Sequence, residues 1–268
     1  MNENVQLVFE QRPRRLKKIL IIGIPLFLIL AWSWSYVDYN GIEENGLRVI
    51  QSIFSGLIKP NQKMLFSFGR GSIPQLVLET VTIAFLGTLL GMILAIPFSF
   101  LSARNIVPKW FSAIGIFIIT VIRTFPPFVY GLLIIVVTGA GPFAGVLTLA
   151  LTSIGMISKL FIEAIEDLDV GIIESLDASG SSNFQKIRFG IIPQLFGNFL
   201  SIAIYRFEIN VKNATILGLV DAGGIGTPLV MAMSAFRWAD VGAILWGLII
   251  LVVFVEWLSS ALRAKVAG

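Results

Sequence analysis

The chain has no cysteine and no histidine among its 268 residues. Without cysteine there is no disulfide bond and no thiol chemistry, and without either residue the usual zinc sites are excluded. The lack of histidine also removes the side chain that most often serves in general acid–base catalysis. Charged residues are scarce as well, at 13% of the chain. We therefore predict no catalytic residue, no metal site and no cofactor.

Motifs that hold nucleotide phosphates are absent too. No G-x-x-x-x-G-K-[ST] stretch occurs, so the chain has no P-loop of its own. A nucleophile elbow and an H-E-x-x-H pair are also missing, which leaves an Asp- or Ser-based intramembrane enzyme as the remaining enzymatic alternative. Gly223, Gly224 and Gly226 follow a predicted membrane helix rather than a strand, so they indicate a turn in an outer loop at 221–228 and not a dinucleotide-binding fingerprint.

Apolar residues dominate what is present, at 56% of the chain. This content is typical of several membrane-spanning helices, and we predict an all-α polytopic protein of the cell membrane. Basic residues are concentrated before the first apolar run and in short loops, so both termini are predicted to be cytoplasmic. The same rule accounts for the net charge of +4, and no nucleic-acid partner is expected. The six predicted spans cover about 19–34, 73–101, 110–137, 143–162, 194–220 and 241–258.

We predict a single transmembrane domain over residues 1–268. Its first part, 1–72, holds the first helix and an external segment with one weak amphipathic pattern at 47–58. The first apolar run ends in an aromatic cluster without an A-x-A-like cleavage site, which favours an uncleaved span over a signal peptide. The core of the domain covers 73–262.

Two local patterns shape the predicted core. Gly87 and Gly91 in the second span have the small-xxx-small spacing that permits close helix approach. In the third span the adjacent Pro126 and Pro127 remove two backbone donors, so this helix must kink or unwind there. Irregular backbone at membrane depth needs protein or water around it. The break is therefore expected to face a protein neighbour or a water-filled path.

A polar segment, Glu174–Pro193, lies between the fourth and fifth predicted spans. Amphipathic patterns on either side of Gly180 predict two short helices separated by a glycine break. Ser181 and Ser182, which follow the glycine, are residue types favoured at helix N-caps. The predicted topology puts this segment in the cytoplasm. Because the chain has no P-loop, we expect a soluble partner to dock on it.

Charged side chains within the fifth span are the sharpest functional clue. Each costs roughly 2.5–3.5 kcal/mol on insertion scales unless it is paired or faces water. Arg206, Asn210 and Asn213 share one face of a helix, and we identify them as candidates for a translocation pathway. Glu208 and Lys212 lie on nearly the opposite face at i and i+4, which predicts a structural ion pair.

Each candidate pathway arginine has an alternative interpretation. Arg206 lies too deep to reach the interface easily, and it either lines the path or binds backbone carbonyls of a neighbouring helix. Arg123 stands immediately before the double proline and is equally open to a pathway or a structural role. The residues alone do not decide between these alternatives.

The polar segment resembles the EAA loop of ABC importer permeases, whose pattern is E-A-A, three residues, G, nine residues, I-x-L-P. Glu174 takes the place of the glutamate, Gly180 that of the glycine and Pro193 that of the proline. By this resemblance the loop covers about 163–193. The departures are Ser175 and Leu176 in place of the alanines, Gly190 in place of the isoleucine and Ile192 in place of the leucine.

A narrower resemblance extends over about Glu79–Val241. Several motifs agree, in order, with permeases of the phosphonate-uptake family, and together they are more specific than the EAA loop alone. The motifs are FLSARN (100–105), RTFPPFVYGLL (123–133), GPFAGVLTLAL (141–151), KLFIEAIEDLD (159–169) and ILGLVDAGGIG (216–226).

This resemblance implies the fold of a type I, binding-protein-dependent importer permease that forms a homodimer in the lipid membrane. The implied partners are a separate ATPase dimer, an extracytoplasmic solute-binding protein and a second copy of the chain. The polar segment would be the site at which ATP-driven closure of the ATPase acts on the bundle. The residues that the resemblance assigns to this coupling are Glu174, Asp177, Gly180, Ser181 and Pro193.

The implied function is ATP-driven import of phosphonate or a related small phosphorus oxyanion. Phosphonates are anions at neutral pH, so a path containing Arg206 and Arg123 is electrostatically reasonable. A secondary anion transporter is the main alternative, although no internal symmetry between halves of the chain supports it. An ABC permease for another small solute is the second alternative, because selectivity resides largely in the binding protein.

Overall fold

The structure is a computed structural model that describes residues 15–37 and 46–267. These residues form helices joined by turns, and none of them lies in a strand, so the predicted all-α class is confirmed. The chain divides into two compact units, Met1–Gln51 and Ser52–Gly268. Residues 38–45 of the expected external segment, and the basic residues before Arg15, lie outside the described part.

The first unit contains α2, Arg15–Tyr36, which holds the first predicted span. Its apolar stretch Ile19–Tyr36 is long enough to cross a membrane, as the uninterrupted run of apolar residues predicts. Near its end the rings of Trp32 and Tyr36 lie 5.7 Å apart, centroid to centroid. This is the aromatic cluster expected at a membrane interface.

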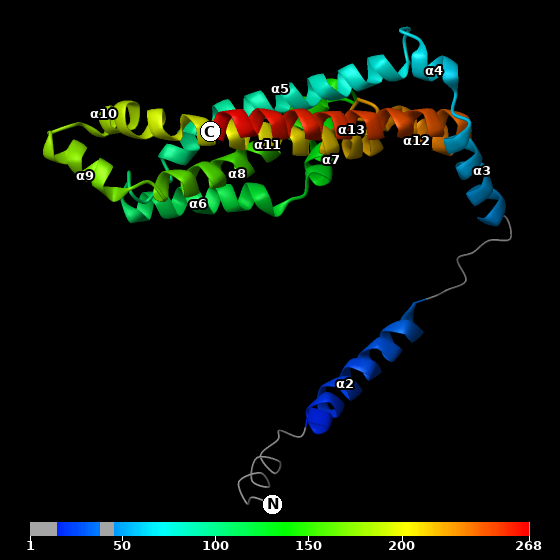
Figure 1. The fold of residues 1–268 in the computed structure, drawn as a ribbon, viewed down its shortest axis with the longest axis horizontal. Coiled ribbons are helices and arrows are strands. Elements are labelled where there is room, and N and C mark those ends of the chain that lie inside the picture. Colours follow the sequence, from blue (N-terminus) through cyan, green and yellow to red (C-terminus); the bar gives the residue numbers. More distant parts are fainter. Residues whose placement is uncertain (1–14, 38–45, 268) are drawn as a thin grey trace, which may run out of the picture. The chain divides into compact units, whose positions relative to one another are not determined.

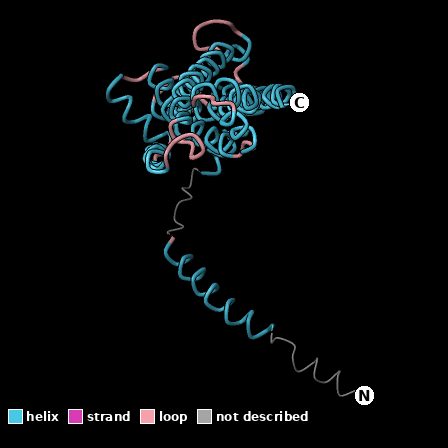
Figure 2. Tube along the Cα trace, turned by 90° about the vertical axis from the view of Figure 1, so that its left-hand side faces the viewer, coloured by secondary structure: helices cyan, strands magenta, loops and turns pink. Residues whose placement is uncertain are grey.

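The second unit is a helical bundle in which α5, α8, α11 and α13 run side by side (Figure 1). Viewed along that direction, several of these helices are seen end on (Figure 2). The helices after α2, in chain order, are α3 (Gly46–Ile58), α4 (Gln62–Phe66), α5 (Ile73–Phe100), α6 (Lys109–Thr124), α7 (Pro127–Thr138), α8 (Pro142–Glu166), α9 (Val170–Ala178), α10 (Asn183–Gln185), a π-helix (Lys186–Ile191), α11 (Ile192–Leu217), a 3₁₀ turn (Gly218–Val220), α12 (Gly226–Ser234) and α13 (Trp238–Ala267).

The most extensive contact in the bundle joins α5 and α8. A Cβ atom on Gly87 would lie 2.5 Å from the Cβ of Leu149, and one on Gly91 would lie 2.4 Å from the Cβ of Ser153. Only glycine permits this approach, which confirms the prediction from the small-xxx-small spacing. Because lipid is as apolar as a leucine side chain, close packing of this kind contributes more to helix association than burial itself does.

The third span is broken where the prolines predict it. α6 ends at Thr124, α7 begins at Pro127, and the two helix axes differ in direction by 85°. Five helices of the described residues are long and apolar enough to span a membrane, and a sixth span results if α6 and α7 are counted together. The prediction of six spans therefore depends on counting this bent pair as one.

The glycine-rich stretch after α11 forms a shorter loop than expected. Gly223 and Gly224 have positive φ angles of 83° and 73°, which confirms a turn. The prediction of a loop as far as Pro228 was wrong, because α12 already begins at Gly226. The loop is held from α5, where Glu79 Oε1 accepts a hydrogen bond of 2.9 Å from the Gly224 N–H.

Candidate functional site

The polar segment lies at one end of the bundle, opposite the end that carries α4 and α12 (Figure 1). Its first helix, α9, begins with the Asp169 side chain accepting a hydrogen bond from the Gly171 N–H at 2.9 Å. It ends in a Schellman motif, in which Gly180 N–H donates to Asp177 O and Ser181 N–H donates to Leu176 O. Gly180 has a φ of +77°, the left-handed conformation that this motif requires and that glycine adopts without strain.

The second half of the polar segment differs from the prediction. Ser182 caps α10 through a capping box with Gln185, as its residue type favours. However, α10 does not end in a separate turn, because a π-helix and then α11 continue it without a gap. The helix that contains the fifth predicted span therefore begins at Asn183, before the expected start of the span at about Gln194. The π-helix ends at Ile191, two residues before Pro193, whose ring would otherwise press on a carbonyl of the preceding turn.

Two contacts hold α9 against the π-helix. Lys186 Nζ forms an ion pair with the carboxylate of Asp177. A Cβ atom on Gly190 would lie 2.5 Å from Leu176 Cδ1, so the leucine occupies the space that a side chain at 190 would fill. Leu176 and Gly190 are both departures from the EAA pattern, one larger and one smaller than the expected residue. The structure brings these two departures into contact, where their volumes offset each other.

The five residues assigned to coupling have different surroundings. Glu174 and Pro193 are exposed, and a Cβ added to Gly180 would have no atom within 4 Å, so all three are accessible at the surface. Asp177 is paired with Lys186, and Ser181 Oγ lies 3.1 Å from Ser179 Oγ. The polar segment therefore presents Glu174 and the glycine turn to solvent or to a partner.

Deeper in the bundle, Arg206 of α11 is 5% exposed and points at α8. Its Nε–H donates to Ser153 Oγ at 2.9 Å, and Nη2 donates to Thr152 Oγ1 at 3.0 Å. Nη1 lies 2.9 Å from the sulfur of Met156. No carboxylate of the described residues lies within 4.0 Å of this guanidinium, so its charge is held by neutral groups.

Asn210 extends this arrangement to a third helix. It is fully buried, and its Nδ2 lies 2.8 Å from both Thr88 Oγ1 of α5 and Ser153 Oγ of α8. Its Oδ1 is buried without a hydrogen-bond donor among the described residues. Asn213 is half-buried and is not hydrogen-bonded to the group in the part of the chain that the structure describes. We call the group the polar cluster; its members are Thr88, Thr152, Ser153, Arg206 and Asn210.

The hydroxyl members of the polar cluster were missed from the sequence. Thr88, Thr152 and Ser153 lie within largely apolar stretches, where a hydroxyl can be satisfied by a carbonyl of its own helix. Thr88, for example, donates to the carbonyl of Ala84 at 2.7 Å. The small-xxx-small pair was a partial signal, because it marks where a neighbouring helix can come close. In the structure the residue that packs against Gly91 is Ser153, and this close approach brings its hydroxyl within reach of α11.

The opposite face of α11 carries a second set of charges. Lys212 Nζ lies 3.2 Å from Glu208 Oε1 and 3.8 Å from a carboxylate oxygen of Glu256. Arg263 Nη1 lies 3.0 Å from Glu208 Oε2. Glu256 and Arg263 both belong to α13, so their part could not be read from the spacing along α11. The four groups have no net charge.

Arg123 reaches α8 from the end of α6. It is exposed, and a Cβ atom on Gly155 would lie 2.7 Å from Arg123 Cγ, so the side chain crosses α8 at this glycine. The next residue of α8, Met156, is the one whose sulfur contacts Arg206. The two predicted pathway arginines therefore approach the same turn of α8 from different helices.

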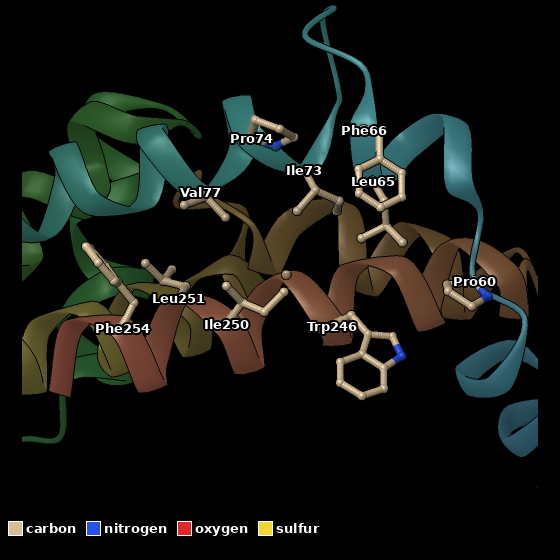
Figure 3. A pocket seen from close by; sticks show the side chains of 11 residues that line it. Pro60, Leu65, Phe66, Ile73, Pro74, Val77, Trp246, Ile250, Leu251 and Phe254 are labelled. Carbon is tan, nitrogen blue, oxygen red and sulfur yellow. The ribbon is translucent and has the colours of Figure 1, made fainter. Parts of the chain in front are cut away.

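An apolar groove of about 480 Å³ lies between α4, α5 and α13. Its lining includes Leu65, Ile73 and Phe254 (Figure 3). The one polar side-chain atom of this lining, Trp246 Nε1, donates to the carbonyl of Leu57 at 2.9 Å. The groove thus offers no free donor to an anion, and the polar cluster is the better candidate site.

Comparison with known proteins identifies a family. The family described as "Binding-protein-dependent transport system inner membrane component" matches residues 87–267, about two thirds of the chain. This match begins in the middle of the second predicted span and includes the third to sixth spans. It includes the polar segment and all five members of the polar cluster.

Curated relatives are similar over most of the chain. The phosphite transport system permease protein PtxC of Stutzerimonas stutzeri is 30% identical over 93% of this chain and 89% of its own length. The phosphate-import permease protein PhnE of Mycolicibacterium smegmatis is 31% identical over 88% of this chain and 43% of its own length.

Solved structures of ABC transporters share the fold. A chain of the MetNI methionine ABC transporter, in an inward-facing conformation, has a TM-score of 0.63 at 20% identity and covers 72% of this chain and 95% of its own. A chain of an amino acid ABC transporter with histidines has a TM-score of 0.55 at 19% identity, covering 86% of this chain and 96% of its own.

Proposed function

We propose that this chain, which belongs to the family of binding-protein-dependent transport system inner membrane components, is the permease subunit of an ATP-driven importer for a small phosphorus oxyanion. The observation that carries the cargo class is the buried guanidinium of Arg206, which no described carboxylate neutralises. The relatives named as phosphite and phosphate permeases support the same class.

The proposed pathway contains Arg123, Arg206, Asn210 and Asn213. An anion that crosses an apolar layer needs donors or cations along its way, and a guanidinium binds tetrahedral oxyanions with two parallel N–H groups. Three of the five N–H groups of Arg206 are used by the neutral contacts on α8. Two donors are left for an anion in a conformation of the bundle that opens the polar cluster.

The proposed assembly contains two copies of this chain in lipid, a separate ATPase dimer and an extracytoplasmic solute-binding protein. The polar segment is the proposed contact with the ATPase, through Glu174, Asp177, Gly180, Ser181 and Pro193. Support comes from its position at one end of the bundle and from the continuous helix that links it to α11. A push on α9 would reach Arg206 through that helix, and the bundle would alternate between two conformations.

Transport tests the cargo. The chain is reconstituted in vesicles with its cognate ATPase and binding protein, and uptake of phosphite, a phosphonate and phosphate is measured with and without ATP. ATP-dependent uptake of at least one phosphorus oxyanion is expected. Uptake that proceeds without ATP but follows an ion gradient would instead favour a secondary transporter, and ATP-dependent uptake of an uncharged solute alone would contradict the cargo class.

A matched pair of glycines tests the coupling. Gly180 and Gly71 both have positive φ angles, 77° and 79°, and neither has an atom within 4 Å of an added Cβ. Both lie in hydrogen-bonded turns, so Gly180→Trp and Gly71→Trp are expected to carry similar backbone strain in different parts of the bundle. We expect Gly180→Trp to abolish ATP-driven uptake or ATPase binding, with Gly71→Trp close to wild type. Equal loss in both variants would mean that strain, and not a contact with the ATPase, is responsible.

A further inference from the structure

The break between α6 and α7 leaves backbone carbonyls without their helical partners. In a continuous helix the carbonyl of Ile122 would accept the N–H of residue 126, and that of Arg123 would accept the N–H of residue 127. Both positions are prolines, which have no N–H. Unpaired carbonyl groups at membrane depth cost several kcal/mol each unless another donor reaches them.

Tyr130 supplies one of the missing donors. Its hydroxyl donates to the carbonyl of Ile122 at 2.9 Å, from the first turn of α7 back to the last turn of α6. Its ring also packs edge-on against Phe125 within the break, with centroids 5.8 Å apart. One side chain of α7 therefore contacts α6 and the connecting residues at the same time. These contacts are made at a bend of 85°, and a straighter helix would separate them.

We propose that Tyr130 is a positioning residue for transport. Its hydroxyl replaces the N–H that Pro126 removes and fixes the angle between α6 and α7. This angle sets the direction of the last turn of α6 and thereby lays Arg123 across α8 at Gly155, beside the turn that Arg206 contacts. The role rests on the proposed function, because Arg123 matters only if an anion passes it.

A distance measurement tests the angle without any cargo. The chain has no cysteine, so spin labels at Trp110→Cys and Val136→Cys would be unique, and both native side chains are well exposed. The helix axes at these residues are about 29 Å apart for a bend of 85° and about 39 Å apart for a straight helix. Labelled chains are diluted with unlabelled ones, so that distances between two copies do not contribute.

Four variants separate the angle from general stability. Tyr130→Phe is expected to broaden the distance distribution and move it toward the longer value, and to lower the uptake rate about tenfold, the factor for one lost hydrogen bond. Tyr130→Phe with Pro126→Ala restores a donor for Ile122, so thermal stability recovers while the distance stays long and uptake stays low. In Pro126→Ala alone, the new backbone N–H and the Tyr130 hydroxyl compete for the carbonyl of Ile122. Tyr205→Phe, on the exposed surface of α11, is the control and should leave both readouts unchanged.

Three outcomes decide the proposal. An unchanged distance distribution in Tyr130→Phe would show that the hydroxyl does not hold the angle. A changed distance with wild-type uptake, or recovery of uptake together with stability in the double variant, would show that the bond is structural only. Since the distance is measured without cargo, a failure of phosphorus oxyanions as cargo would overturn the proposed function and leave the effect of Tyr130 on the angle supported.

Discussion

Arg206 and Glu208 are two residues apart near the middle of α11, and their surroundings are opposite. Both are buried, at 5% and 7% exposed. Glu208 is contacted by two basic groups, Lys212 and Arg263, at 3.2 and 3.0 Å. Arg206 is contacted by two hydroxyls and a sulfur, and by no described carboxylate. One face of the helix therefore balances its charge, whereas the other leaves a positive charge uncompensated.

This difference indicates different roles for the two faces. An ionised group at the centre of a membrane helix costs about 2.5–3.5 kcal/mol on insertion scales, and partners of opposite sign offset that cost. The Glu208 face meets this condition within the chain. The Arg206 face does not, and an uncompensated charge at such a position is a reason to expect a function. The comparison can be tested by removing each charge and measuring both stability and transport.

The largest effect is expected for Arg206→Gln. Loss of a charged hydrogen bond to the anion should lower the rate of ATP-driven uptake about 10- to 100-fold. Stability should change little, because each hydrogen bond to a neutral group is worth about 1 kcal/mol, and removing the cost of the buried charge offsets the absence of these bonds. Uptake and the apparent melting temperature in detergent are the two measurements. Unchanged uptake in a folded variant would contradict the pathway role.

A smaller effect, and of the opposite kind, is expected for Glu208→Gln. It leaves Lys212 and Arg263 without their shared carboxylate, which should lower the free energy of unfolding by about 2–3 kcal/mol, less than for a fully buried pair. Uptake per folded molecule should remain close to wild type. Glu208→Gln would thus lower stability and spare uptake, whereas Arg206→Gln would lower uptake and spare stability.

Glu256→Gln is the matched control for this prediction. Glu256 also faces Lys212, but at 3.8 Å and with its side chain 59% exposed, so its removal should cost about 0–1 kcal/mol. If both glutamine variants lowered the melting temperature equally, the charge balance around Glu208 would not be what stabilises this face.

The sequence predicts contacts within a helix better than those between helices. Lys212 reaches Glu208 because four residues make about one turn, which any helical pattern reveals. Arg263 is 55 residues further along the chain, and only the packing of α13 on α11 brings it there. The same holds for the polar cluster, where Arg206 and Asn210 stood out as polar residues in an apolar run, whereas Thr88 and Ser153 did not.

For breaks in helices, too, the sequence predicts what is local to one helix better than what depends on packing between helices. Pro126 and Pro127 predict that the third span is interrupted, because a missing N–H is a local property. The angle of 85° is not set by the prolines alone, since α6 and α7 each pack against α8. Pro193 shows the converse, because this proline does not interrupt its helix, and α11 follows the π-helix without a gap.

The smallest predicted effect concerns the neutral partners of Arg206. Ser153 and Ser158 are both fully buried on α8, but they differ in what they bind. Ser153 Oγ accepts hydrogen bonds from Arg206 and Asn210 at 2.9 and 2.8 Å, whereas Ser158 Oγ makes a single long bond of 3.4 Å to the carbonyl of Ala95. Each serine can be replaced by alanine with the same loss of volume.

Ser153→Ala should lower the free energy of unfolding by about 1–2 kcal/mol, because two buried donors lose their acceptor. Ser158→Ala should cost less than about 0.5 kcal/mol, since its carbonyl partner keeps a bond within its own helix. The difference between the two melting temperatures isolates the hydrogen bonds from the change in packing. If the two variants melted together, Arg206 would not be held by Ser153, and the hydroxyls of α8 would not explain how an unneutralised arginine is tolerated in the bundle.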